Sequence, residues 1–298
     1  MTGVEDTVAD EAEPISDLTS GAPSGHGRCV LVAVVFGAAL AVATGQSALT
    51  LLIVTAVVQA VLIVSWVLGT GMPGRIGGLG IAGAAAAGAD VAVSVDPHRQ
   101  LAPLLVGLGL AVSVMFVHQL VRGVVRTRTV ESLSHAALLV VAVSSLPCYL
   151  QLRHEFDGRD LALGSLLAVG VALVVGHLAD MIWSRPRFDT EVPRGLFAFA
   201  LGAIAAGAAG TKGLHDVVAF TTVRSIYVSV AIGAVTGLLA IAGAFAVHRL
   251  PEFVPVSATD DGRPHPGGRQ ALLPLAQVLL PISLAAPAAY LLCLTGHS

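Results

Sequence analysis

Long apolar stretches separated by short polar breaks form the pattern of this chain between residues 29 and 294. A helix needs roughly 20 predominantly apolar residues to cross about 30 Å of hydrocarbon, with every backbone amide satisfied inside it. The first and seventh stretches are short and the third is rich in Gly and Ala, so we expect eight or nine spans. The pattern therefore predicts an all-α polytopic membrane protein, a helical bundle with spans at 29–44, 48–68, 76–95, 101–121, 134–152, 161–183, 196–210, 223–247 and 271–294.

Composition supports this class and narrows the expected partners. Hydrophobic residues make up 55% of the chain and charged residues 12%, which is typical of an integral membrane protein. We expect membrane lipids as partners and no nucleic acid. The cysteines, Cys29, Cys148 and Cys293, lie far apart, so the sequence has no CxxC pair and they are expected to be packing residues.

The polar segment before the first apolar stretch is acidic, and no basic residue precedes Arg28. A secretory signal begins with positive charge. We therefore expect residues 1–28 to be a disordered acidic cytoplasmic tail without a cleaved leader, and residues 29–298 to be a multi-pass transmembrane domain. The acidic residues of the tail are Glu5, Asp6, Asp10, Glu11, Glu13 and Asp17.

Basic residues predict the orientation, because Arg and Lys in short loops favour the cytoplasmic side. With nine spans, the side of the N-terminal tail holds eleven of the sixteen basic residues. The single lysine, Lys212, among fifteen arginines is typical of a GC-rich bacterial genome. We expect a protein of the bacterial inner (plasma) membrane, with its N-terminus in the cytoplasm and its C-terminus outside.

Small residues spaced four apart predict where helices approach closely, because lipid supplies no hydrophobic drive for helix association. Such faces would also allow a homodimer. Three prolines in the last span predict kinks. The small-residue stripes are Gly80, Ala84 and Gly88; Gly202, Ala206 and Gly210; and Gly233 with Gly237, and the prolines are Pro274, Pro281 and Pro287.

Two polar residues end the sixth span in the sequence "VVGHLADMIW". His177 and Asp180 are three apart and share one helix face. An ionisable residue inside a span is a functional-site hypothesis by default. The alternative is an interfacial Asp180 paired with Arg185 or Arg187 near the cytoplasmic surface.

Two other spans carry polar residues that are better explained by ordinary packing. Asp90 lies near the outer end of the third span, and His118 lies one turn before Arg122 near the inner face. Neither has a convincing partner in the sequence. Taken with the absence of an internal repeat, they give little support to a transporter.

Two predicted inner loops, 184–195 and 256–268, combine arginines with glycine-rich backbone. Arginine gives bidentate donors and exposed amides add to them, so these loops suit a phosphate. Ordinary positive-inside turns have the same composition. The headgroup- or phosphate-binding candidates are Arg185, Arg187, Arg194, His265, Gly267 and Gly268, and the candidate metal ligands of an active enzyme are Asp180 and Asp261.

The order of these features over residues 28–294 resembles the phosphatidate cytidylyltransferase (CDP-diacylglycerol synthase) family. The resemblance rests on the helix end "HLADMIW", the following "EVPRGLFAFALG", and the long run from residue 243 to 292. It implies a cytidylyltransferase-like helical bundle. It also aligns Asp261 with the Asp of a Lys-Asp motif, and His265, Gly267 and Gly268 with a Gly-His-Gly-Gly motif.

The groups that such an enzyme needs for catalysis are absent from the sequence. Cytidylyl transfer requires carboxylates that hold a divalent cation, yet Asp261 is the last acidic residue and Lys212 falls in a predicted outer loop. We therefore expect a non-catalytic, cytidylyltransferase-like protein that binds an anionic lipid headgroup and needs no cofactor. The alternatives are a diverged lipid phosphoryl or nucleotidyl transferase using Mg²⁺, and a small-molecule or lipid transporter.

Overall fold

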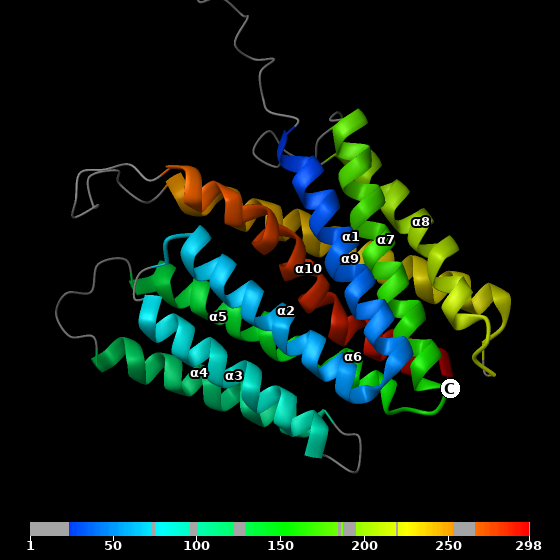
Figure 1. Cartoon of the computed structure of the whole chain (residues 1–298), viewed down its shortest axis with the longest axis horizontal. Helices are drawn as coiled ribbons and strands as arrows, with labels where there is room; N and C mark the ends of the chain where they lie inside the picture. The colour runs from blue at the N-terminus through cyan, green and yellow to red at the C-terminus, as the bar shows by residue number, and fades with distance from the viewer. Residues whose placement is uncertain are drawn as a thin grey trace, which may run out of the picture.

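The computed structural model describes residues 24–72, 75–95, 101–121, 129–183, 186, 195–218, 220–252 and 266–297, and these residues form helices joined by short connections (Figure 1). Each helix forms where an apolar stretch allows the backbone to satisfy its own hydrogen bonds in lipid. In chain order the helices are α1 (Ser24–Gln46), α2 (Ala48–Gly69), α3 (Arg75–Val95), α4 (Ala102–Val121), α5 (Thr129–Ser145), α6 (Cys148–Arg153), α7 (Gly158–Ile182), α8 (Leu196–Leu214), α9 (Thr222–Glu252) and α10 (Pro266–His297).

The all-α polytopic fold predicted from the sequence is confirmed. Within the described residues, eight helical segments are long and apolar enough to cross a membrane. The segment that falls short is in α4, whose apolar part covers Ala102–His118. The chain is therefore a membrane protein with about eight spans, within the predicted range of eight or nine.

Large apolar side chains on the outer faces of the helices agree with a lipid environment. Leu31 is 64% exposed, Ile53 56% and Leu105 66%. A soluble monomer rarely exposes extended apolar surface, because water makes such exposure unfavourable. On the inner faces, Leu40, Leu51 and Trp66 are completely buried.

The fifth predicted span, 134–152, corresponds to the apolar segment Leu133–Arg153, which the structure divides into two helices. α5 ends at Ser145 and α6 begins at Cys148, with Leu146 and Pro147 in a turn between them. Proline has no backbone N–H and its ring crowds the preceding turn, so it interrupts a helix at this point. By contrast, α10 continues through Pro274, Pro281 and Pro287 as one helix.

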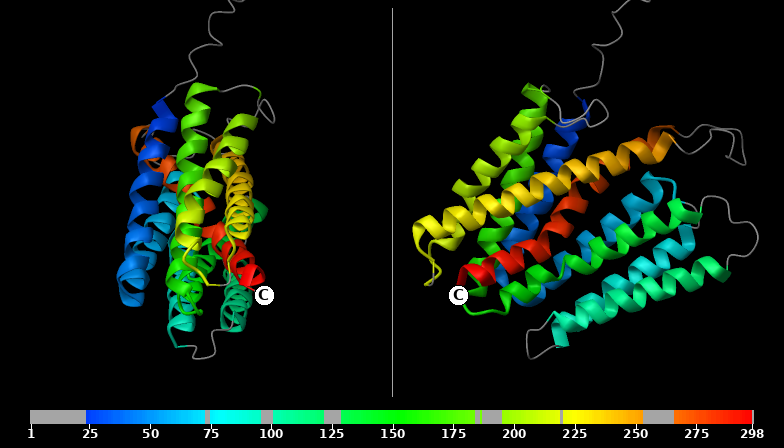
Figure 2. Two further views of the ribbon diagram at one scale, coloured as in Figure 1. Left: turned by 90° about the vertical axis from the view of Figure 1, so that its right-hand side faces the viewer. Right: turned by 180° about the vertical axis from the view of Figure 1, so that it is seen from behind.

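One half of the molecule consists of α1, α7, α8 and α9. In this half, α7 lies between α1 and α8, and α9 packs against both α7 and α8 (Figure 1). Helices α3 and α4 form a hairpin at the opposite edge, where α2 and α5 cover α3 (Figure 2). Helix α10 contacts both halves, because it packs against α1, α7 and α9 as well as α2, α5 and α6.

The small-residue stripes on α8 and α9 lie at helix contacts. A Cβ atom added at Gly202 would lie 2.8 Å from the carbonyl oxygen of Ala172 in α7, and one added at Gly233 would lie 3.1 Å from the Cα of Ala203 in α8. The stripe on α3 behaves differently. A Cβ added at Gly80 or at Gly88 would meet no atom of the described residues within 4 Å. The spacing therefore predicts helix contacts in α8 and α9, whereas the α3 stripe makes no close helix contact through these glycines.

Candidate metal site

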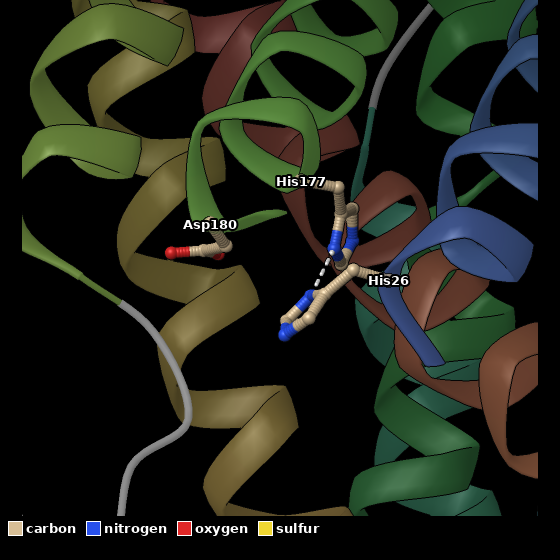
Figure 3. A group of neighbouring side chains, drawn as sticks. All are labelled: His26, His177 and Asp180. Atoms are coloured by element: carbon tan, nitrogen blue, oxygen red, sulfur yellow. Dashed lines mark hydrogen bonds between the residues drawn. The ribbon is translucent and has the colours of Figure 1, made fainter. Parts of the chain in front are cut away.

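The two polar residues that the sequence singled out at the end of α7 lie buried at one end of the bundle. His177 is fully buried and Asp180 is 4% exposed. The first turn of α1 brings a third side chain, His26, to the same place (Figure 3). Helices α1 and α7 pack along each other, so the beginning of α1 meets the end of α7. The fold thereby brings His26 next to His177, which lies 151 positions away in the chain, and to Asp180.

The two imidazole rings approach each other through their Nδ1 atoms. The Nδ1 atoms of His26 and His177 lie 3.5 Å apart, and the ring centroids are 5.8 Å apart at an interplanar angle of 48°. Figure 3 shows the Asp180 carboxylate beside this pair, on the same helix as His177. One ligand atom from each of the three residues lies within 4.8 Å of the others.

The separation of the two imidazole nitrogens fits a divalent transition metal. Zinc–nitrogen bonds of about 2.0–2.1 Å in a tetrahedral site place two imidazole nitrogens about 3.3 Å apart, close to the 3.5 Å between His26 and His177. The separation of up to 4.8 Å to the carboxylate is wider than a bound ion allows. The Asp180 oxygen would have to move by up to about 1.5 Å to reach the ligand separation of a tetrahedral site.

The backbone at the start of α8 holds one oxygen of the Asp180 carboxylate. The amide of Gly195, which precedes α8, donates to Asp180 Oδ1 at 2.8 Å. The next amide, of Leu196, donates to the carbonyl oxygen of Pro186 at 2.9 Å. A carboxylate has two oxygens, so one can accept this hydrogen bond while the other binds a cation. Such partners outside the coordination sphere orient metal ligands.

Sequence reasoning missed His26 because it assigned residues 1–28 to a disordered tail. The structure begins α1 at Ser24 instead, and His26 belongs to its first turn. One signal was available: the predicted topology already placed the start of the first span and the end of the sixth on the same side of the membrane. His26, at the start of the first span, was therefore a candidate for contact with His177 and Asp180, at the end of the sixth.

Most of the other predicted site residues fall outside the described part of the chain. Gly267 and Gly268 lie in the first turn of α10. The predicted pairing of Asp180 with Arg185 or Arg187 and the predicted headgroup site thus stay predictions, because Arg185, Arg187, Arg194, Asp261 and His265 lie outside the described residues.

The polar residues in the α3–α4 hairpin have specific neighbours. The side chain of His118 fills the space that a side chain at Gly77 would need, which agrees with the predicted packing role. Asp90 accepts a hydrogen bond of 3.1 Å from Gln59. The sequence indicated no partner for Asp90, because Gln59 is uncharged and lies in an apolar stretch, where no charge pattern marks it.

Comparison of the chain with models of known protein families, with curated proteins and with solved structures gives no match. The side chains at the start of α1 and the end of α7 are therefore the basis for inferring function.

Proposed function

We propose that this multi-pass membrane protein binds a divalent transition-metal ion through His26, His177 and Asp180. The observation that carries the proposal is the 3.5 Å approach of two imidazole Nδ1 atoms, with a buried carboxylate within 4.8 Å. Two histidines and a carboxylate form a common ligand set for such ions. By the predicted topology, the site faces the cytoplasm.

The donor atoms select the class of ion. Imidazole suits Zn²⁺, Fe²⁺, Co²⁺ and Ni²⁺, whereas Mg²⁺ and Ca²⁺ prefer oxygen ligands. Two nitrogens and one oxygen therefore favour a transition metal over Mg²⁺. This set differs from the Asp180 and Asp261 pair that the sequence predicted for an active enzyme.

An ion in this site would have a structural effect and an open position. It would connect the first turn of α1 to the last turns of α7. Because Asp180 also accepts a hydrogen bond from Gly195, the ion would be linked to the start of α8 as well. Three protein ligands leave one position of a tetrahedral ion for water or another oxygen. A phosphate oxygen of a lipid headgroup is a suitable fourth ligand, which would join metal binding to the headgroup binding predicted from the sequence.

Metal titration of the purified full-length protein tests this proposal. The protein is isolated in detergent with an affinity tag that contains no histidine, stripped with a chelator, and titrated with Zn²⁺ in a calorimeter and with Co²⁺ by absorption spectroscopy. We expect one ion per chain and a Co²⁺ spectrum of low coordination number. Binding should be lost in His26→Ala and in His177→Ala.

Two further variants separate ligand loss from other effects. Asp180→Asn keeps an oxygen that can accept from Gly195 but removes the charge, and we expect it to weaken binding by at least about tenfold. His215→Ala is the matched control, because His215 is 70% exposed beside Asp216, and it should bind like the parent protein. Failure of the parent protein to bind, or parent-like binding by both histidine variants, would refute the proposal.

A further inference from the structure

A second polar group lies inside the membrane, away from the metal site, where three helices meet. The side-chain amide of Gln59 in α2 donates to Asp90 Oδ1 in α3 at 3.1 Å and to the carbonyl oxygen of Val143 in α5 at 3.0 Å. Gln59 is 1% exposed. One buried amide therefore joins a carboxyl group to the backbone of another helix.

The carbonyl of Val143 is available because of the break between α5 and α6. In a continuous helix the N–H of residue 147 would donate to the carbonyl oxygen of residue 143. Residue 147 is a proline, which has no N–H. The Gln59 amide supplies the missing hydrogen bond, so the break at Pro147 and the Asp90 carboxyl share one partner.

The hydrogen bond also places Asp90 deeper than its position in α3 suggests. Gln59 is eleven residues from Ala48 and ten from Gly69 (59 − 48 and 69 − 59), the two ends of α2, so it lies at the middle of a spanning helix. A carboxylate at such a depth is costly unless it is paired with a cation or carries a proton. One neutral amide supplies a hydrogen bond and no counter-charge.

The described neighbours of α3 bring no positive charge to Asp90. Helix α2 has no ionisable side chain at all. Arg75, the described basic residue of α3 itself, is at the opposite end of that helix. On α4, His118 packs at Gly77 near that same end.

Among the titratable side chains of α5 and α6 that the structure describes, three also face other partners. In α5, His135 meets Trp66 edge to face, with ring centroids 6.2 Å apart. In α6, Tyr149 donates to the carbonyl oxygen of Ile282, and Arg153 donates to that of Gln46 at 3.5 Å. The remaining one, Cys148, is a buried free thiol.

We propose that the Asp90 carboxyl is a proton-binding site within the membrane, and that Gln59 links its state to the helix break at Pro147. The ligand is a proton because a metal cation needs several oxygen ligands, whereas the group facing Asp90 Oδ1 is an N–H donor. When a proton binds to a carboxylate oxygen, the carboxyl becomes neutral and a weaker acceptor. The hydrogen bond from the Gln59 amide to Asp90 then weakens, and the hydrogen bond from the same amide to the carbonyl oxygen of Val143 changes with it.

An apolar cavity lies near this site. A cavity of about 200 Å³ lies between α3, α4 and α5, and its lining includes Ala89 and Ser144. These residues directly precede Asp90 and directly follow Val143 in the chain. Asp90 itself is half-buried, so reagents that dissolve in lipid can reach it.

Two measurements on the full-length protein in lipid nanodiscs test for the proton. The first is infrared difference spectroscopy of the carboxylic acid C=O band during a pH titration. We expect a band from a desolvated acid that disappears in Asp90→Asn and persists in Asp216→Asn, since Asp216 is 77% exposed. The second is labelling with N,N′-dicyclohexylcarbodiimide, which reacts with protonated carboxyls in apolar surroundings. Mass spectrometry should find the adduct on Asp90, decreasing as the pH rises.

The labelling experiment needs no variant, so the proposal stays testable even if Asp90→Asn does not fold. Hydrogen exchange of the amides in residues 144–149 tests the link to the helix break. We expect protection factors, which are exchange rates corrected for the intrinsic pH dependence of amide exchange, to change with pH in the parent protein and to stay constant with pH in Gln59→Leu. An Asp90 that is neither labelled nor visible as a protonated acid overturns the proton site. A titrating Asp90 with unchanged protection factors at residues 144–149 overturns the link.

Discussion

The Nδ1 atoms of His26 and His177 lie 3.5 Å apart although the two residues are 151 positions apart in the chain. At this distance the two nitrogens can share one proton, and two protonated rings would repel each other. One Nδ1 lone pair therefore points at its neighbour. A metal ion that replaces the shared proton would bind the Nδ1 lone pairs of both rings at once. The two nitrogens would then have a partner although the pair is buried, so burial is compatible with metal binding.

Metal affinity should fall as the pH is lowered. A histidine ligand binds through a neutral imidazole nitrogen, so protons compete with the metal for both rings. The apparent affinity for Co²⁺ at a series of pH values measures this competition. We expect the same pH dependence in His215→Ala, and an affinity that does not change with pH would contradict binding through His26 and His177.

Metal binding should also raise the unfolding temperature of the protein. An ion that binds only the folded state stabilises it by about 2.7 kcal/mol at a free concentration 100 times the dissociation constant. Trp183 lies next to the site, with its ring centroid 6.4 Å from that of Phe197, so tryptophan fluorescence can follow unfolding in detergent. Asp180→Asn should show a smaller shift, and an equal shift in both proteins would argue against Asp180 as a ligand.

The close contact of α7 and α8 should make Gly202 sensitive to a single added methyl group. A Cβ there would lie 2.8 Å from the backbone oxygen of Ala172, which cannot move like a side chain. We expect Gly202→Ala to lower the free energy of unfolding by about 1–3 kcal/mol. Gly80→Ala is the matched control, because its Cβ would meet no atom within 4 Å, and unfolding titrations in detergent compare the two. Equal effects would contradict the proposed contact.

Orientation in the membrane can be tested by placing single cysteines at the two ends of the bundle. The native Cys29, Cys148 and Cys293 are all at most 4% exposed and should stay unlabelled. By the predicted topology, an impermeant maleimide should label His215→Cys in intact cells and Gly25→Cys only after the cells are opened. The reverse pattern would show that the N-terminus lies outside.

Local sequence signals explain which parts of the fold could be predicted. Apolar length determines whether a helix spans lipid, so the helices agree with the predicted spans to within a few residues at most ends. The break at Pro147 was missed because hydropathy averages over a window and ignores the lost N–H. Asp180 was found through its unusual setting in an apolar run. Its partner His26 was not, because no local pattern records that α1 and α7 are neighbours.

The shared hydrogen-bond partner at the α5–α6 break predicts that changes at Gln59 and Pro147 are coupled. Gln59→Leu leaves the Val143 carbonyl buried without its 3.0 Å hydrogen bond, and we expect a loss of about 1–3 kcal/mol in the free energy of unfolding. Pro147→Ala restores an N–H that can donate to that carbonyl. The double variant should therefore lose less stability than the sum of the single variants, by about 0.5–3 kcal/mol. Unfolding titrations of all four proteins in one detergent give this coupling, and strictly additive effects would mean that the Val143 carbonyl is not the group through which Gln59 and Pro147 interact.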